Sequence, residues 1–270
     1  MTRPIEEELK THSEEIISRI RNNLIPFIPR GTKNYVDHGL AHSIEVGNKK
    51  NELVTWLGKY AFAFNPVEEN ALNLAIWTHD LGCIIDRSKN HETWSVRILK
   101  LIDYGIEKDL KNILLELIKY HSSKNTNNVI NLKDKAYGAH YTARMDITAA
   151  TLRLADALDV GERTDHRIDL ASRAPPEIIQ ILTKFRKPNQ VTLNHWSAHN
   201  SCDGVHLDIT NNKVLVHSKY GSQNVANINQ VLIPDIRNEL KIFNSITHKP
   251  KYANYLFDTL RVNIVKHKFQ

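Results

Sequence analysis

The sequence is poor in cysteine and has no long hydrophobic run. Only two of its 270 residues are cysteines, Cys83 and Cys202, which excludes a disulfide framework and favours a reducing compartment. Its apolar stretches are interrupted by charges before they reach the length of a membrane span. The acidic, polar N-terminus also lacks the apolar stretch of a secretory signal. These absences argue against a secreted or membrane-spanning protein, and we expect a cytoplasmic location with no membrane association.

The composition is that of a globular protein with a substantial core. Hydrophobic residues make up 41% of the chain and charged residues 24%, and the length allows one large domain or one domain with an appendage. The net charge of +6 suits polyanionic partners such as nucleotides or nucleic acid, although many basic proteins bind neither. The positions of the 14 histidines are more informative than this charge.

The spacing of hydrophobic residues predicts helices through the first two thirds of the chain. Asn65 has the character of an N-cap, and Pro66 suits the first helical position. Glu68 and Glu69 suit the positive end of this helix, and we expect Gly82 to end it. The expected helices cover residues 4–25, 37–61, 65–82, 91–103, 107–121, 144–160 and 175–187.

After about residue 188 the sequence no longer shows helical spacing alone, and it contains strand-like alternation. The segment GVHLDITNNKVLVHS (204–218) alternates apolar and polar residues on both sides of Asn211 and Asn212, which predicts a β-hairpin. The spacing predicts a further helix at 225–247 and a last strand at 255–267.

The predicted fold class is therefore mainly α, a helical bundle with a smaller C-terminal α+β extension. We expect the helical domain to cover residues 1–187 and the extension to cover 188–270. Within the first domain, residues 123–135 are polar and are expected to form a mobile loop.

Two pairs of residues have the character of metal ligands. His38 and His42 are four residues apart, so both can face the same side of one helix. His79 and Asp80 are adjacent, and adjacent helical residues point about 100° apart. They can therefore converge on one ion where the helix ends or where the ion lies between helices. A hydrogen-bonded core histidine or an ordinary surface pair would explain each feature taken alone.

Asp156 interrupts a helix face that is otherwise apolar. A buried carboxylate without a partner costs on the order of several kcal/mol, which a divalent cation would remove. An ion pair with Arg153 or an N-cap role would also explain this aspartate. The order of His42, the His79–Asp80 doublet and Asp156, each within a predicted helix, favours a metal site.

This ordered set resembles the HD superfamily of metal-dependent phosphohydrolases, over roughly residues 30–165. DHGLAHS, which contains His42, is similar to the first motif of the branch written DHGxxHS. LRLADALD, which contains Asp156, is similar to the last motif of that branch and of the C-terminal HD-like part of exopolyphosphatases. The resemblance implies an HD-type helical bundle in which water activated by a divalent ion (Mn²⁺, Fe²⁺, Co²⁺, Ni²⁺ or Mg²⁺) is the nucleophile. The ligands that it implies are His42, His79, Asp80 and Asp156.

The superfamily also has a two-metal form, with two additional histidines between the doublet and the last aspartate. His91 and His121 lie in that interval, but His91 follows the doublet more closely than we expect for the two-metal phosphodiesterases. We therefore expect one ion and leave a second open. These two histidines could instead contact the substrate phosphate or donate a proton, and together with Asp80 they are the candidate catalytic residues.

Negative charge that develops on a phosphate during hydrolysis requires cations nearby. The candidate substrate-binding residues are His38, Lys124, Arg144, Arg163 and Arg167. Asp159 follows Asp156 by one turn, where it could either orient a metal ligand or form a surface pair with Arg163.

The segment NHWSAHNSCDG (194–204) is the one part of the last third with several residues capable of chemistry. A second metal site is one interpretation, but the spacing matches no zinc pattern, and a lid or dimer surface is the simpler one. The residues concerned are His195, Trp196, His199, Cys202 and Asp203.

The sequence thus predicts a metal-dependent phosphohydrolase or phosphodiesterase that acts on a nucleotide or another phosphate ester. Its expected partner is the phosphorylated substrate, with nucleic acid and a second copy of the chain as further candidates. The alternative is a non-catalytic HD-like module that senses a nucleotide or docks a partner.

Overall fold

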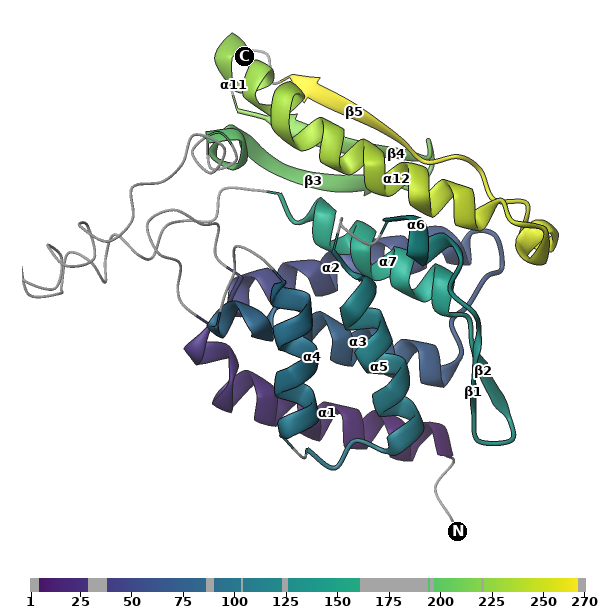
Figure 1. Cartoon of the computed structure of the whole chain (residues 1–270). Helices are drawn as coiled ribbons and strands as arrows, with labels where there is room; N and C mark the ends of the chain where they lie inside the picture. Colours follow the sequence, from purple (N-terminus) through teal and green to yellow (C-terminus); the bar gives the residue numbers. More distant parts are fainter. Residues whose placement is uncertain are drawn as a thin grey trace, which may run out of the picture.

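A computed structural model of the chain describes residues 5–28, 38–85, 90–102, 104–122, 126–160, 194, 197–219 and 221–266. The predicted helix at 175–187 and the predicted domain boundary at 187/188 lie outside these residues. Helices dominate, and a small sheet lies toward the C-terminus, so the predicted fold class is confirmed (Figure 1).

The N-terminal part is a bundle of helices. In Figure 1, α1 crosses the lower end of the molecule, and α7 lies between the other helices and the C-terminal layer. The helices are α1 (Ile5–Asn23), α2 (Leu40–Gly58), α3 (Pro66–Thr78), α4 (His91–Leu101), α5 (Lys108–Tyr120), α6 (Thr126–Ile130) and α7 (Met145–Leu158), with short 3₁₀ turns η1 (Ile25–Phe27) and η2 (Leu81–Ile84).

The start of α3 shows how local sequence sets these boundaries. Asn65 accepts hydrogen bonds from the backbone N–H groups of Val67 and Glu68, and the Glu68 side chain accepts one from the Asn65 N–H, which completes a capping box. The predicted end of this helix is wrong, because α3 ends at Thr78 and Gly82 lies in the following turn η2. Gly82 instead allows the backbone of η2 to lie close to that of α4.

The segment predicted as a loop, 123–135, is partly regular. Residues 126–130 form α6, and Lys135 begins a short hairpin of β1 (Lys135–Tyr137) and β2 (Tyr141–Ala143), which are antiparallel. The expectation of a mobile loop is therefore wrong for these residues, while 123–125 lie outside the described part of the chain.

The C-terminal part places one long helix on a three-stranded sheet. The predicted hairpin is present as β3 (Cys202–Asp208) and β4 (Lys213–Ser218), and β5 (Arg261–Lys266) pairs parallel to β4. A parallel pair needs a crossover connection, which here is helical. It consists of α11 (Ser222–Asn227), a π-helical turn η4 (Ile228–Leu232), α12 (Ile233–Thr247) and a 3₁₀ turn η5 (Pro250–Tyr255).

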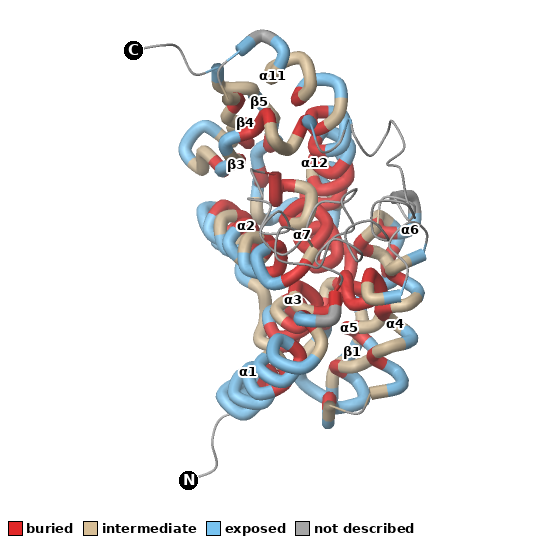
Figure 2. Tube along the Cα trace, turned by 90° about the vertical axis from the view of Figure 1, so that its left-hand side faces the viewer, coloured by how far each residue is buried: buried red, intermediate tan, exposed pale blue. Residues whose placement is uncertain are grey.

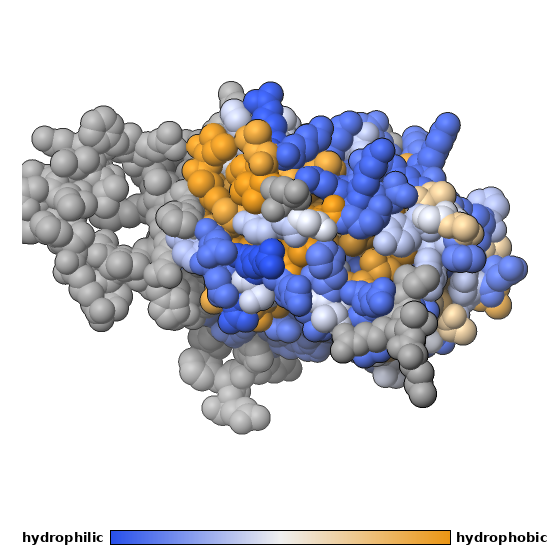
Figure 3. All heavy atoms as spheres, turned by 90° about the horizontal axis from the view of Figure 1, so that it is seen from below, coloured by the Kyte–Doolittle hydropathy of each residue, from blue (hydrophilic) through white to orange (hydrophobic). Residues whose placement is uncertain are grey.

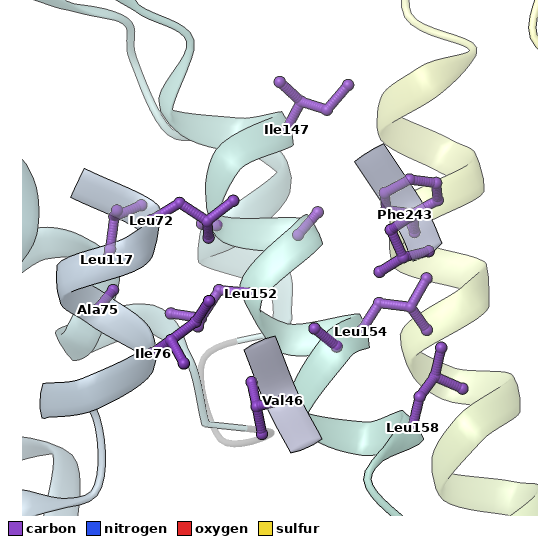
Figure 4. Packing of buried hydrophobic residues seen from close by; sticks show 14 of the residues in the cluster. Val46, Leu72, Ala75, Ile76, Leu117, Ile147, Leu152, Leu154, Leu158 and Phe243 are labelled. Carbon is purple, nitrogen blue, oxygen red and sulfur yellow. The ribbon is translucent and has the colours of Figure 1, made fainter. Parts of the chain in front are cut away.

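Helix α7 is the centre of the hydrophobic core. Figure 4 shows Leu152 on the side of α3, while Leu154 and Leu158 lie on the side of α12, the helix that carries Phe243. Nearly every residue of α7 is buried, and in Figure 2 the buried trace is concentrated along the middle of the molecule. Because α7 is buried on nearly all sides, helices of both parts of the chain pack on it.

The surface is mostly hydrophilic where Figure 3 shows it, with one group of hydrophobic side chains on this lower face. The large hydrophobic side chains that are exposed among the described residues come from several segments: Leu40, Ile44, Ile85, Leu101 and Leu256. Singly exposed apolar residues are ordinary on folded proteins. None of the described helices is long and apolar enough to cross a bilayer.

Candidate metal centre

Three helix ends meet at one place and bring the predicted ligands together. His42 lies in the first turn of α2, His79 is the C-cap of α3, and Asp156 lies in the last turn of α7. The Asp156 Oδ1 atom is 3.3 Å from His42 Nε2 and 3.7 Å from His79 Nε2. Asp80 adds its Oδ2 atom, 3.4 Å from His42 Nε2 and 3.6 Å from His79 Nε2.

The imidazole rings of His42 and His79 are oriented by their Nδ1 atoms. His79 Nδ1 lies 3.0 Å from the Ile76 carbonyl oxygen, to which it donates. His42 Nδ1 lies 2.5 Å from Asp159 Oδ2, and donates to this carboxylate. With their protons on Nδ1, both Nε2 atoms present lone pairs, and these two atoms face each other at 3.1 Å.

Between neutral rings of these tautomers the two lone pairs repel, and either a proton on one Nε2 atom or a cation beside both removes the repulsion. Two nitrogens that each bind one ion at about 2.1 Å and about 90° apart are about 3.0 Å from each other. The observed separation of 3.1 Å between the Nε2 atoms of His42 and His79 therefore fits two neighbouring ligands of one ion. A donor set of imidazole nitrogen and carboxylate oxygen suits divalent transition metals.

The charges in this group also favour a cation. Burial alone would lower the pKa of His79, but the carboxylates of Asp80 and Asp156 outweigh it and raise the pKa to about 9. Burial would raise the pKa of Asp80, and the neighbouring His38 and His79 instead lower it well below its ordinary value. The pKa of Asp156 is lowered for the same reason, by His79 and His42 against the effect of burial. The carboxylates thus hold positive charge at this place.

A second group repeats the same arrangement on the other oxygen of Asp80. Asp80 Oδ1 lies 3.4 Å from His91 Nε2 and 3.7 Å from His121 Nε2, and the two Nε2 atoms are 3.0 Å apart. His121 Nδ1 donates to the Ile118 carbonyl oxygen at 2.6 Å, which leaves its Nε2 lone pair toward His91. Burial lowers the pKa of His91, which favours its neutral, ligating form.

Asp80 therefore lies between two groups of candidate ligands. The ligating atoms of His42, His79 and Asp156 lie within 4.8 Å of one another, as do those of Asp80, His91 and His121. A third such set, His38, His42 and Asp80, overlaps both. In the part of the chain that the structure describes, all the His, Cys, Asp and Glu groups that could hold a metal ion belong to this one cluster.

The turn η2, which follows the His79–Asp80 doublet, is held against α4 by hydrogen bonds of Ser95. Ser95 Oγ donates to the His79 carbonyl oxygen at 2.6 Å and accepts from the Gly82 N–H at 2.7 Å. A Cβ atom on Gly82 would lie 1.9 Å from the His91 carbonyl oxygen. Glycine is thus required here because the backbones of η2 and α4 approach closely, and this contact places His91 beside Asp80. The sequence contains no motif that identifies Ser95.

The predicted substrate-binding residues divide into three kinds. His38 joins the cluster, where its Nδ1 contacts Asp80 Oδ2, and its side chain is 22% exposed. Arg144 does not join it, contrary to expectation: it lies at the N-terminus of α7, at the opposite end from Asp156, and pairs with Glu68 at 2.5 Å. The other three, Lys124, Arg163 and Arg167, lie outside the described residues.

Two expectations about acidic residues are resolved by the geometry. Asp156 is less buried than expected, because its side chain is 28% exposed. Asp159 is 5% exposed and pairs with His42, so the orienting interpretation holds for it rather than a surface role. Arg153, considered as a partner of Asp156, forms an ion pair with Glu239.

The segment 194–204 gains no support as a metal site. His195 and Trp196 lie outside the described residues, and none of His199, Cys202 and Asp203 belongs to a candidate metal group among the residues described. Cys202 is buried at the start of β3, where burial raises its pKa to about 11. It is therefore a poor thiolate ligand.

The comparisons with known proteins agree with this geometry. A family model described as HD-CE, an HD-type domain, matches residues 32–242, more than three quarters of the chain. The matched range contains the whole cluster and continues through most of α12. No curated protein matches the sequence. On the extent of the family match, the chain belongs to the HD-CE family.

Proposed function

We propose that this protein is a metal-dependent phosphohydrolase or phosphodiesterase that acts on a nucleotide or another phosphate ester. The observation that carries the proposal is the pair of facing imidazoles on each side of Asp80, with Nε2 separations of 3.1 Å and 3.0 Å. Two neutral imidazoles arranged in this way are stabilised when a cation lies beside both nitrogens, and divalent cations are the usual cofactors of phosphate-ester hydrolysis.

The ligand geometry supports two ions rather than the single one expected from the sequence. The first would be held by His42, His79, Asp156 and the Oδ2 atom of Asp80, as the resemblance to the HD superfamily implies. The second would be held by Asp80 Oδ1, His91 and His121. Both groups contain imidazole nitrogen and carboxylate oxygen, and Mn²⁺, Fe²⁺, Co²⁺, Ni²⁺ and Mg²⁺ remain the candidates.

In this proposal the protein's own residues orient the metal ligands and balance the positive charge of the ions. A bound divalent ion would lower the pKa of water and polarise a phosphoryl oxygen. Asp159 keeps the His42 ring in the tautomer that binds metal. His38 contacts Asp80 and is partly exposed, so it can meet the substrate phosphate or give a proton to the leaving oxygen.

Positive charge for the rest of the phosphate is proposed to come from Lys124, Arg163 and Arg167. The reason is the charge balance: two divalent ions against Asp80, Asp156 and Asp159 leave little excess to bind an anion. The formal net charge of +6 is consistent with an anionic substrate, and a nucleotide, an oligonucleotide or a nucleic-acid end would each satisfy it.

The test combines metal analysis with phosphate release. Purified protein should contain two equivalents of a divalent transition metal and release phosphate or a nucleotide from at least one member of a panel of nucleotides and cyclic nucleotides. Asp80→Asn keeps the shape and removes the charge, so it should abolish turnover and reduce the metal content. His121→Ala should lose one equivalent of the two.

Asp146→Asn is the matched control, because Asp146 is a buried aspartate at the opposite end of α7 from the cluster. This control should keep both metal equivalents and its turnover. Nucleotide binding without any turnover, in protein loaded with both ions, would favour the non-catalytic sensing module instead. A full complement of metal in Asp80→Asn would contradict the assignment of the site.

A further inference from the structure

Helix α7 carries a buried arginine one turn before Asp156. The Arg153 side chain is 1% exposed, and its guanidinium forms two hydrogen bonds with Glu239 of α12: Nε donates to Oε2 at 2.8 Å and Nη2 to Oε1 at 2.7 Å. This is the bidentate geometry that a guanidinium makes with a carboxylate, and it holds the planar group in one orientation.

The remaining donors of Arg153 reach the residues on each side of His121. Nη1 donates to the Tyr120 carbonyl oxygen at 3.0 Å and also to the Ser122 carbonyl oxygen. Tyr120 is the last residue of α5, and His121 is its C-cap. Carbonyl groups at a helix C-terminus have no partner within the helix, so a cation here both satisfies them and complements the helix dipole.

These contacts fix the backbone that carries His121. With the carbonyls before and after it held by Arg153, and with Nδ1 donating to Ile118 O at 2.6 Å, the His121 ring has little freedom to turn. Its Nε2 atom is thereby aimed at Asp80 Oδ1 and at His91 Nε2.

We propose that Arg153 is a positioning residue for the second metal ion, and that the C-terminal part of the chain completes the site by supplying Glu239. This inference rests on the proposed function in its two-ion form. Glu239 provides the negative charge that compensates the buried guanidinium and orients it, since a buried ion is stable only with a partner. The helix α12 therefore acts on the metal site through Arg153, without touching the metal itself.

The test measures binding of each ion by titrating metal-free protein with Mn²⁺ in a calorimeter. Wild type should bind two equivalents. Glu239→Gln should keep the affinity of one equivalent and weaken the other at least tenfold, because the guanidinium loses its orienting partner. The weakened equivalent should be the one that His121→Ala removes.

Glu68→Gln is the matched control. Glu68 is a fully buried glutamate that pairs bidentately with Arg144 near the opposite end of α7, so its loss disturbs folding in a similar way. It should lower the melting temperature and leave both Mn²⁺ affinities unchanged. The proposal would be overturned if Glu239→Gln weakened both Mn²⁺ affinities equally, or if Glu68→Gln weakened one of them selectively. Arg153 would then have a structural role only.

A double variant covers the case in which Glu239→Gln does not fold. Arg153→Met with Glu239→Leu removes both charges, and replacing a buried ion pair with apolar residues of similar volume is often neutral for stability. This variant should fold with a lowered melting temperature, because the Tyr120 and Ser122 carbonyls lose their donor, and it should lose the affinity of the second equivalent at least tenfold. Wild-type affinity for both ions in a folded double variant would refute the positioning role.

The measurement separates this inference from the proposed function, because it needs no turnover. If wild type binds two ions and releases no phosphate, the proposed function fails, while a selective loss in Glu239→Gln still supports the positioning role. If wild type binds a single Mn²⁺ equivalent, the two-ion form fails and the positioning role fails with it.

Discussion

Replacing Gly82 with alanine is expected to disturb the junction between the His79–Asp80 doublet and α4. An ideal Cβ at this position would lie 1.9 Å from the His91 carbonyl oxygen and 2.7 Å from the Ser95 nitrogen. Real Cβ atoms essentially never approach closer than 3.0 Å. The two backbones must therefore separate by roughly 1 Å.

The free-energy cost of this separation exceeds the stabilisation that alanine gives by restricting the unfolded chain. Overpacking costs about 1–3 kcal/mol, and this contact belongs at the upper end because the neighbours are helix backbone and not a flexible side chain. Alanine also reduces the freedom of the unfolded chain, which stabilises by about 0.4–1 kcal/mol. We therefore expect Gly82→Ala to lower the free energy of unfolding by about 2 kcal/mol.

The same shift should also reach the metal site. His91 is the first residue of α4, and its Nε2 atom lies 3.0 Å from that of His121. A displacement of α4 by roughly 1 Å is large compared with the tolerance of a metal–ligand distance, about 0.2 Å. In the two-ion proposal, Gly82→Ala should therefore weaken binding of the second ion more than that of the first.

Urea unfolding and Mn²⁺ titration would check both expectations, with Gly47→Ala as the matched control. Gly47 lies inside α2, and a Cβ there would meet nothing within 4 Å. Alanine at this position should stabilise the protein by about 0.5–1 kcal/mol, because glycine is a poor helix former. If Gly82→Ala were as stable as wild type with both ion affinities intact, the close approach of η2 and α4 would not be what requires glycine.

Three further predictions address the cluster, the pH dependence and a helix start. Asp159→Asn should weaken binding of the first ion about 10–100-fold, because Asp159 orients His42, and an unchanged calorimetric affinity would contradict this. Burial alone would raise the pKa of Asp146, but hydrogen bonds from Lys249, Tyr252 and Lys251 hold it below its ordinary value. This carboxylate therefore stabilises the fold above the unfolded pKa, and the stabilisation is lost as pH falls through the folded pKa. Asp146→Asn should make unfolding less dependent on acid pH, and an unaltered stability curve below about pH 4 would count against it. Asn65→Ala should cost about 1 kcal/mol in denaturant unfolding, because it removes the N-cap of α3, and no change would mean that the capping box contributes nothing.

Features that depend on neighbours in the chain could be predicted from the sequence. The N-cap of α3 involves Asn65 and Glu68, which are within one turn of each other, so their residue types are sufficient evidence. The alternation in 204–218 likewise predicted the β3–β4 hairpin, since successive residues of a strand face opposite sides. The order of the histidines and aspartates, with the motifs around them, was enough to predict the candidate ligands that the fold brings together.

The contact that requires glycine at position 82 could not be predicted from the neighbouring residues in the chain. Near the end of an apolar helical segment, glycine is typical of a helix stop, so the sequence predicts that the helix ends at Gly82. The structure uses the missing side chain for contact with His91 and Ser95 of α4. Which helix packs against a glycine depends on tertiary packing, and the spacing of residues in the sequence does not predict this helix.

The sequence left a second ion open, and the tertiary structure decided how the candidate ligands divide into two groups. The sequence predicted Asp80 as one candidate ligand, while the fold directs one of its oxygens toward His42 and the other toward His91. Arg153 and Glu239 meet across the interface of α7 and α12, far apart in the chain. Such contacts depend on the directions in which packed helices aim their side chains. Those directions are set by burial of the whole core, to which residues throughout the chain contribute.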